Sequence, residues 1–167
     1  MSRVWLALRA IVYAALFLTL WTGVALMCRT LDKYIPLAVP GAARIPGLVL
    51  ILAGTALDIT TVCFFVLEGR GTPALFDPPR KFVPHGPYRF MRNPMYLGYV
   101  TVLVGLGFWL KSVAMVLFAV VALLVIHAFV VLVEEPGLHK RFGEEYVDYC
   151  RAVPRWIPCF TPQHLPE

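Results

Sequence analysis

Two short polar stretches, about forty residues apart, carry the side chains best suited to chemistry. The first is Arg92-Asn93-Pro94, and the second is the pair Glu134-Glu135. Asn is a good helix N-cap and Pro is favoured in the first helical position, so we expect a helix to begin there. The backbone N–H groups of such a helix start, together with the Arg92 guanidinium, would form a site for a carboxylate or a phosphate.

The two glutamates stand where a helix is expected to end. Acidic side chains are disfavoured there by the helix dipole, and the carboxylates of Glu134 and Glu135 also repel each other. A positively charged partner is therefore expected, although solvated residues at the end of a membrane span would give the same pattern. A helix start that binds an anion and faces two carboxylates would suit a zwitterionic ligand that also carries a cation.

Two more titratable residues fall inside apolar segments. His127 precedes Glu134 by seven residues, about two turns along the same helical face. It either lines a polar cavity or, in the more common arrangement, bonds a backbone carbonyl. Asp58 lies well inside an apolar segment, where acidic side chains are functional candidates, but the sequence offers no partner for it. The four cysteines form no C-x-x-C pair, and no metal site is expected.

These residues belong to a chain with the composition of a membrane protein. Of its 167 residues, 59% are hydrophobic and 15% are charged, against roughly 45–50% and 25% in soluble domains. The composition excludes disordered, collagen-like and disulfide-rich classes. We expect the net charge of +5 to mark loops on one side of a membrane. A nucleic-acid partner is not indicated, because no basic stripe with aromatic residues accompanies the charge.

Four apolar stretches are long enough to cross a hydrocarbon core of about 30 Å at about 1.5 Å per residue. They cover residues 10–28, 45–67, 94–110 and 112–133. The fold class predicted is all-α integral membrane, as a single domain over residues 1–167 with four transmembrane helices. Only Lys111 and Ser112 join the last two spans, so these should form a tight antiparallel hairpin. That hairpin would bring the two polar stretches together.

An even number of spans places both termini on one side of the membrane. Eleven Lys and Arg residues fall on that side and four on the other. The positive-inside rule therefore places the termini, the second loop and the two polar stretches in the cytoplasm, in a multi-pass protein of an inner or plasma membrane.

The tail beyond the last span shows a helical pattern. Its apolar residues recur at intervals of three and four, opposite charged positions: Leu138, Phe142, Tyr146, Tyr149 and Val153. This predicts an amphipathic cytoplasmic helix over residues 138–153 that lies on the membrane or caps the bundle. A surface tail without chemistry would show the same pattern.

The motifs resemble those of known membrane enzymes. Residues 69–98 read GRGTPALFDPPRKFVPHGPYRFMRNPMYLG, and residues 134–158 read EEPGLHKRFGEEYVDYCRAVPRWIP. Together they resemble the isoprenylcysteine carboxyl methyltransferase family and are similar to the related membrane phospholipid methyltransferases. With the hairpin between them, the motifs cover roughly half of the chain. The resemblance implies a membrane enzyme that binds S-adenosyl-L-methionine at the cytoplasmic face.

Position by position, the resemblance implies two sets of site residues. The cofactor-binding set is His85, Gly86, Pro87, Tyr88, Asn93, Pro94, Tyr96, Leu97, Gly98, Glu134 and Glu135. The catalytic set is Arg92, Glu134, Tyr146 and Arg155. The family often has histidine where this chain has Asn93, which can donate a hydrogen bond but cannot titrate near neutral pH. A proton-carrying role would then be absent or pass to His85.

The resemblance and the residue chemistry suggest the same reaction. Arg92 and Asn93 suit the cofactor carboxylate, and the glutamates suit its ammonium or its ribose hydroxyls. The acceptor would be an amphiphile or lipid that enters from the bilayer. Carboxyl O-methylation of an isoprenylcysteine-like or lipid acceptor is expected, with Arg155 or Arg92 holding the carboxylate. Methylation of a phospholipid amine is the alternative, with Glu134 or His85 as the base.

Two further classes stay open. NADPH-dependent membrane reductases have a similar cytoplasmic half, but a phosphate-bearing cofactor would favour more arginines and no paired acids at the site. A non-catalytic membrane protein could use the same scaffold. The sequence leaves the oligomeric state and the identity of the acceptor atom open.

Overall fold

A computed structural model of the chain describes residues 3–64, 67 and 85–159, and within these residues it contains helices and no strand. The α-helices are α1 (Arg3–Cys28), α2 (Arg44–Phe64), α3 (Pro94–Trp109), α4 (Val113–Phe129), α5 (Glu135–Phe142) and α6 (Glu144–Ala152). The shorter elements are the 3-10 turns η1 (Arg29–Tyr34), η2 (Gly41–Ala43) and η4 (Gly86–Arg89) and the π-helical turn η5 (Val130–Glu134). The predicted all-α class is confirmed for this part of the chain.

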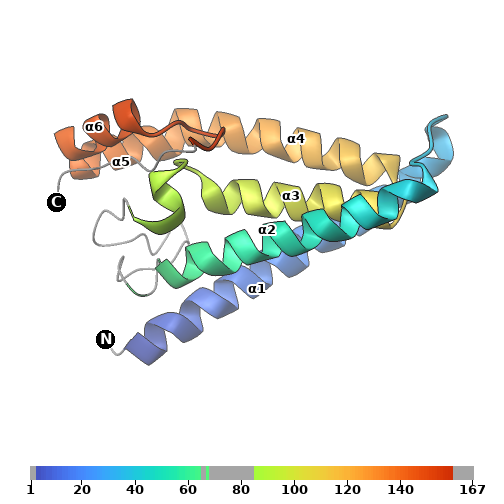
Figure 1. Cartoon of the computed structure of the whole chain (residues 1–167), viewed down its shortest axis with the longest axis horizontal. Coiled ribbons are helices and arrows are strands. Elements are labelled where there is room, and N and C mark those ends of the chain that lie inside the picture. The colour runs from blue at the N-terminus through green and yellow to red at the C-terminus, as the bar shows by residue number, and fades with distance from the viewer. Residues whose placement is uncertain (1–2, 65–66, 68–84, 160–167) are drawn as a thin grey trace.

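The long helices run side by side, and their ends lie in two groups, one at each end of the bundle (Figure 1). The start of α1, the end of α2, the start of α3 and the end of α4 lie toward the same side of the picture. We call this side the motif end. Among the described residues, three helical segments are long and apolar enough to cross a membrane, and they cover Ile11–Tyr34, Gly41–Phe64 and Val113–Phe142. The fourth span, expected over residues 94–110, stays a prediction, because α3 has only 16 residues.

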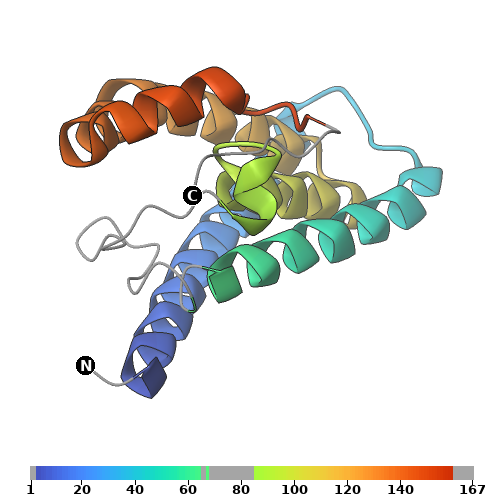
Figure 2. The same cartoon turned by 60° about the vertical axis from the view of Figure 1, so that its left-hand side comes forward.

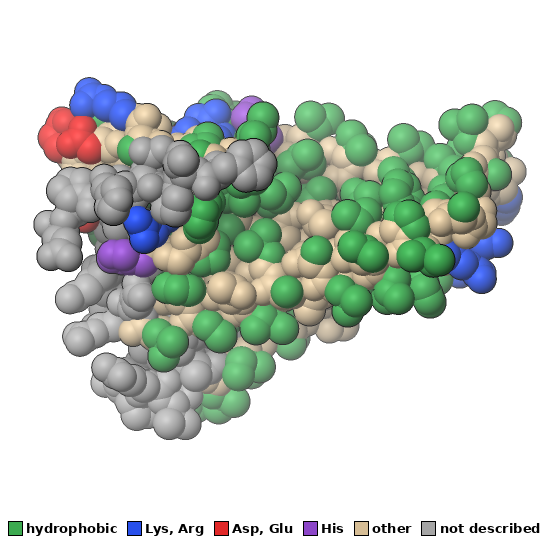
Figure 3. Space-filling model, viewed as in Figure 1, with side chains coloured by type: hydrophobic (Ala, Val, Ile, Leu, Met, Phe, Trp, Pro, Cys, Tyr) green, Lys and Arg blue, Asp and Glu red, His purple; other side chains and the backbone are tan. Residues whose placement is uncertain are grey.

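The surface matches a lipid environment. Large apolar side chains on α1, α2 and α4 point away from the protein, for example Leu16, Leu52 and Leu124, which are more than 60% exposed. Figure 3 shows hydrophobic side chains over the length of the bundle, with charged side chains collected toward its two ends. Apolar surface of this extent is stable in lipid and costly in water.

Backbone contact between α2 and α3 is the closest packing in the bundle. A Cβ atom added to Gly47 would lie 2.8 Å from the Gly105 carbonyl oxygen, and one added to Gly54 would lie 2.5 Å from the Gly98 carbonyl oxygen. Small residues permit this approach and are typical of helix pairs in membranes. The contact also sets Asp58, one turn beyond Gly54, directly against α3.

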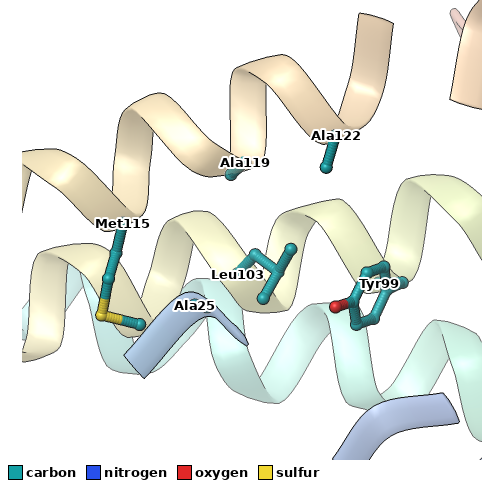
Figure 4. Packing of buried hydrophobic residues seen from close by; sticks show 6 residues of the cluster. All are labelled: Ala25, Tyr99, Leu103, Met115, Ala119 and Ala122. Atoms are coloured by element: carbon teal, nitrogen blue, oxygen red, sulfur yellow. The ribbon is translucent and has the colours of Figure 1, made fainter. Parts of the chain in front are cut away.

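On its other side α3 packs against α4. A buried cluster joins these two helices to α1, and it consists of Ala25, Tyr99, Leu103, Met115, Ala119 and Ala122. Figure 4 shows the alanines of α4 above the larger Tyr99 and Leu103 side chains of α3. Because α3 is covered from two sides, its sequence is apolar on all faces rather than amphipathic.

The turn between α3 and α4 is as tight as predicted. Lys111 takes a positive φ of 56°, and the Ser112 hydroxyl caps α4 by accepting from the Met115 amide at 3.1 Å. A second cap comes from outside the hairpin, since Asp32 Oδ1 accepts from the Ala114 amide at 2.8 Å. The sequence did not predict this tie between η1 and α4.

The tail differs from the single helix predicted over residues 138–153. Gly143, at φ +60°, a conformation that glycine adopts readily, separates α5 from α6. In Figure 2, α6 doubles back alongside α5. The predicted apolar positions still share one cluster, because Tyr146, Tyr149 and Val153 are buried with Leu138 and Phe142 packed on them. They pack within the protein because the chain reverses at the glycine.

Candidate functional site

The two polar stretches meet at the motif end, as the hairpin predicts. Arg92 Nη1 donates to Glu135 Oε1 at 2.9 Å, and the Tyr96 hydroxyl donates to Glu134 Oε2 at 2.9 Å. The donors belong to the start of α3, and the carboxylates to the junction of η5 and α5. Residues far apart in the sequence therefore form one polar cluster at the motif end.

Glu135 is held by two guanidinium groups. Arg155 donates from Nε to Oε1 and from Nη2 to Oε2, both at 2.8 Å, while Arg92 shares Oε1. Planar bidentate pairing of this kind is among the strongest side-chain contacts. The hydrogen bond with Glu135 raises the pKa of the Arg155 guanidinium. Glu135 thus has its negative charge compensated by the protein itself.

Glu134 has a different environment from its neighbour. It is half-buried, and the contact described for its carboxylate is the neutral Tyr96 hydroxyl rather than a cation. Among the contacts described for the Glu134 carboxylate, none is with a positively charged group. Of the two glutamates, Glu134 is the one able to pair with a cationic ligand.

Asn93 does not act as the predicted side-chain cap. It occupies the N-cap position of α3, but among the described residues its side chain makes no capping bond. Its Nδ2 instead donates to the Arg155 carbonyl at 3.1 Å. Pro94 takes the first helical position, as expected. The amide groups at the start of α3 consequently lack a side-chain acceptor from Asn93.

The segment after α6 lies across the start of α3, and we call residues 153–159 the C-terminal strap. The Arg92 amide donates to the Pro154 carbonyl and the Cys159 amide donates to the Phe90 carbonyl, both at 2.9 Å. These backbone bonds position Arg155 beside Glu135. The sequence assigned Arg155 to the site through the resemblance alone, and the strap supplies the physical reason.

His127 has a partner that the sequence did not predict. Its Nδ1 accepts from the Trp156 indole N–H at 3.0 Å, whereas the sequence suggested a backbone carbonyl as its partner. The bond joins α4 to the C-terminal strap. His127 and Trp156 are 29 residues apart and belong to no common motif, so the sequence held no pattern from which this pair could be predicted.

Three tyrosines, Tyr88, Tyr146 and Tyr149, lie near the cluster. The Tyr149 hydroxyl donates to the Tyr88 carbonyl at 2.8 Å. Burial raises the pKa of Tyr88, Tyr146 and Tyr149, so these phenols stay neutral. Tyr146, expected in the catalytic set, is only 4% exposed and lies on α6. As neutral phenols, these side chains can donate hydrogen bonds but cannot serve as bases near neutral pH.

The remaining residues of the expected cofactor set have mixed environments. His85 is exposed and precedes η4. Gly86 has φ +59°, and a Cβ there would lie 2.5 Å from the Phe64 ring at the end of α2. Gly98 contacts α2 through its Cα face, which indicates helix packing. Pro87 and Leu97 are partly buried, in η4 and α3. Motif residues 69–84 lie outside the described residues.

Two polar atoms near the cluster are buried without a partner. Arg92 Nε and Asp58 Oδ1 have no hydrogen-bond partner in the part of the chain that the structure describes. Cys150, which the sequence analysis did not single out, contacts the same arginine, with Sγ 2.9 Å from Arg92 Nη1. Buried polar atoms without partners are uncommon in folded proteins and are often found where a ligand binds.

Comparison with known proteins gives a family. The model of the phospholipid methyltransferase family matches residues 42–145, which include α2, α3, α4 and both glutamates. Protein-S-isoprenylcysteine O-methyltransferases A and B of Arabidopsis thaliana are each 32% identical to the chain over 117 residues. An uncharacterized protein of Haemophilus influenzae is 35% identical over 63 residues, which are 38% of this chain and 100% of that protein.

The alignments do not cover the relatives fully. The two Arabidopsis proteins match over 67% of this chain but only 57% of their own length. The family match also ends before the C-terminal strap, which begins at residue 153. Arg155 is therefore tied to the site by the contacts of this structure.

Proposed function

The chain belongs to the phospholipid methyltransferase family, and we propose that it is an integral membrane S-adenosylmethionine-dependent methyltransferase that acts on an amphiphilic acceptor. The observation that carries the proposal is the meeting of the two motifs. Arg92 contacts Glu135, and Tyr96 contacts Glu134, each at 2.9 Å. Because the chain spans about half the length of its Arabidopsis relatives, its activity rests on this geometry as well as on the likeness.

The side chains at the motif end fit the charged groups of the cofactor. S-adenosylmethionine carries a carboxylate, an ammonium and a sulfonium. Arg92 Nε, buried without a partner among the described residues, and the start of α3 suit the carboxylate. Glu134 suits the ammonium or the ribose hydroxyls. When bound, the cofactor supplies an electrophilic methyl group.

The rest of the expected set would position the ligand and exclude water. The η4 turn, which contains Gly86, Pro87 and Tyr88 and is preceded by His85, lies next to the end of α2 and the start of α3. Tyr146 and Tyr149 close the inner side of the cluster, where they keep water away. Methyl transfer mainly requires alignment of donor and acceptor in a site without water, which such packing supplies.

We infer that the motif end faces the cytoplasm and that both termini lie there. In the described residues, the basic side chains near the motif end are Arg9, Arg89, Arg92, Lys140, Arg141, Arg151 and Arg155. The opposite end carries Arg29, Lys33, Arg44 and Lys111. The excess of positive charge supports this orientation.

The acceptor atom has two candidates. Carboxyl O-methylation of an isoprenylcysteine-like acceptor is supported by the activity for which the Arabidopsis relatives are named. Methylation of a lipid amine is favoured by the pairing of the two arginines of the site. Arg92 and Arg155, which were expected to hold an acceptor carboxylate, both bind Glu135. An anionic acceptor would have to displace that contact.

Binding measurements on the detergent-solubilised chain test the cofactor. Isothermal titration with S-adenosylhomocysteine should give heat, and titration with NADPH should give none. Binding of NADPH alone would favour a reductase, and binding of neither would favour a non-catalytic protein.

Lipid extracts incubated with a radiolabelled methyl donor test the acceptor. Methyl esters release their label in base, whereas methylated amines keep it. Label that is lost in base would support O-methylation, and label that is retained would support N-methylation.

A further inference from the structure

We propose that Trp156 and His127 are positioning residues of the site, because the hydrogen bond between them holds the C-terminal strap on α4 and keeps Arg155 on Glu135. Neither residue belongs to the catalytic or cofactor-binding sets expected from the sequence. The inference rests on the proposed methyl transfer, since Arg155 and Glu135 are part of the cluster that would bind the cofactor.

The strap reaches the site without regular secondary structure of its own. Residues 153–159 follow the end of α6 and contain bends but no helix or strand. Figure 1 shows them, in red, running back along α4. Two backbone hydrogen bonds tie the strap to the start of α3, from the Arg92 amide to the Pro154 carbonyl and from the Cys159 amide to the Phe90 carbonyl. The position of the strap therefore depends on contacts with other elements.

The pair of Trp156 and His127 ties the strap to a second element. Among the described residues, the hydrogen bond that joins the strap to α4 runs from the Trp156 indole N–H to His127 Nδ1, at 3.0 Å. The two rings also lie against each other, with centroids 6.1 Å apart, a spacing typical of aromatic pairs. The strap is thus held on two sides, by its backbone at the start of α3 and by the indole at α4.

Arg155 lies between these two attachments. Its neighbours Pro154 and Trp156 carry the backbone bond to the start of α3 and the side-chain bond to His127. The Arg155 guanidinium must present Nε and Nη2 to the two oxygens of Glu135, at 2.8 Å each. Planar pairing of this kind depends strictly on geometry. Movement of Trp156 away from α4 would shift Arg155 through one peptide unit and weaken its pairing with Glu135.

The hydrogen bond has a fixed direction. An indole N–H can only donate, so Nδ1 of His127 is unprotonated and the neutral ring carries its proton on Nε2. His127 is exposed on α4, within the apolar segment Val113–Phe142 that is long enough to cross a membrane. Lipid offers no replacement partner, so a broken bond would leave both polar groups unsatisfied. A side chain with an acceptor near the position of Nδ1 should keep the bond, and one without an acceptor should lose it.

Variants on both sides of the bond test the proposal in the full chain in nanodiscs. Trp156→Phe removes the donor and His127→Leu removes the acceptor, whereas His127→Asn keeps an acceptor oxygen near the position of Nδ1. Isothermal titration with S-adenosylhomocysteine measures the affinity of the site. Its dissociation constant should rise about three- to tenfold in Trp156→Phe and in His127→Leu, the effect of one hydrogen bond between segments of a membrane protein. His127→Asn should stay within about twofold of the wild type.

The reactivity of Cys159 reports on the strap itself. Its Sγ lies 3.2 Å from the Phe90 carbonyl oxygen while the strap is in place. A strap that leaves α4 should expose this thiol. Labelling with a maleimide, followed by mass spectrometry of the peptide that contains Cys159, should be faster in Trp156→Phe and in His127→Leu than in the wild type. Labelling in His127→Asn should match the wild type, and the midpoint of thermal unfolding should stay the same in all of these variants.

Two further variants serve as controls. Trp109→Phe removes an indole at the other end of α3, where the side chain is 42% exposed, and should leave affinity and labelling unchanged. The double variant Trp156→Phe, His127→Leu should lose no more affinity than the weaker of the two single variants, because both changes break the same bond. Additive losses would show that the two residues act independently and would overturn the proposal.

Wild-type affinity or wild-type labelling in His127→Leu would also overturn it. Equal losses in His127→Asn and His127→Leu would assign the effect to the imidazole ring rather than to the bond, with the same consequence. A lower unfolding midpoint in both single variants would assign the pair to folding and overturn the positioning role. If the wild type does not bind S-adenosylhomocysteine, the proposed methyl transfer fails, whereas the labelling of Cys159 still decides whether the pair holds the strap.

Discussion

Arg155 donates hydrogen bonds from Nε and Nη2 to the two carboxylate oxygens of Glu135, at 2.8 Å each. This bidentate pair ties the C-terminal strap to the start of α5, and Arg92 joins it from the start of α3. Three segments distant in sequence therefore converge on one carboxylate. We infer that Glu135 holds the site together while Glu134 faces the cationic part of the ligand.

Replacing Glu135 by Gln should destabilise the protein and weaken cofactor binding. The amide cannot pair with two guanidinium groups, and both Arg92 and Arg155 would be left partly buried without a counter-charge. We expect a loss of about 1–3 kcal/mol in the free energy of unfolding, because the pair is only partly exposed to solvent.

Thermal unfolding in detergent measures this loss, and titration with S-adenosylhomocysteine measures binding. Asp148→Asn, which removes the exposed partner of Arg151, is the control and should change stability by less than about 0.5 kcal/mol. An unfolding midpoint in Glu135→Gln equal to that of the wild type would contradict the role of Glu135.

Tyr96→Phe should separate ligand binding from folding. The variant keeps the ring and removes only the hydroxyl that donates to Glu134 at 2.9 Å. Without this donor the carboxylate is less well oriented, and we expect affinity for S-adenosylhomocysteine to fall about five- to tenfold, the effect of about 1 kcal/mol. Isothermal titration measures it. Unchanged affinity would show that Glu134 is not oriented for the ligand by Tyr96.

The meeting of the two motifs could be predicted from the sequence because it depends on the length of one connection and of the two helices that it joins. Lys111 and Ser112 leave no room for any connection other than a tight hairpin, and the lengths of the two helices then fix which residues face each other. The strap was not predictable in the same way. Its bonds, such as Arg92 to Pro154, are backbone contacts between distant segments, and no side-chain pattern encodes them.

The contact between α2 and α3 corresponds to a pattern of glycines in the sequence that hydropathy does not detect. Gly47 and Gly54 are seven residues apart, as are Gly98 and Gly105. Seven residues are two helical turns, so each pair lies on one face of its helix. Apolar stretches predict spans, but the partner of each span depends on such small residues, and two matching pairs would have indicated the α2–α3 contact.

Cysteine labelling tests the orientation of the chain. In a background with the native cysteines replaced by serine, a membrane-impermeant maleimide should label Leu75→Cys only from the cytoplasmic side and Gly41→Cys only from the other side. The expectation follows from the distribution of Lys and Arg. Intact cells and inverted vesicles give the two directions of access. The reverse pattern would refute the cytoplasmic placement of the site.

Gly54→Ala tests whether backbone contact between α2 and α3 positions Asp58. The new Cβ would lie 2.5 Å from the Gly98 carbonyl oxygen and 2.8 Å from a Val102 methyl group, so the helices must move apart. We expect a loss of about 1–3 kcal/mol, typical of overpacking. Gly23→Ala in α1 is the control, because nothing lies within 4 Å of its Cβ, and helix propensity should make it neutral or slightly stabilising. If both variants unfold at the same temperature, the close contact does not hold the two helices together, and Asp58 must be positioned by other means.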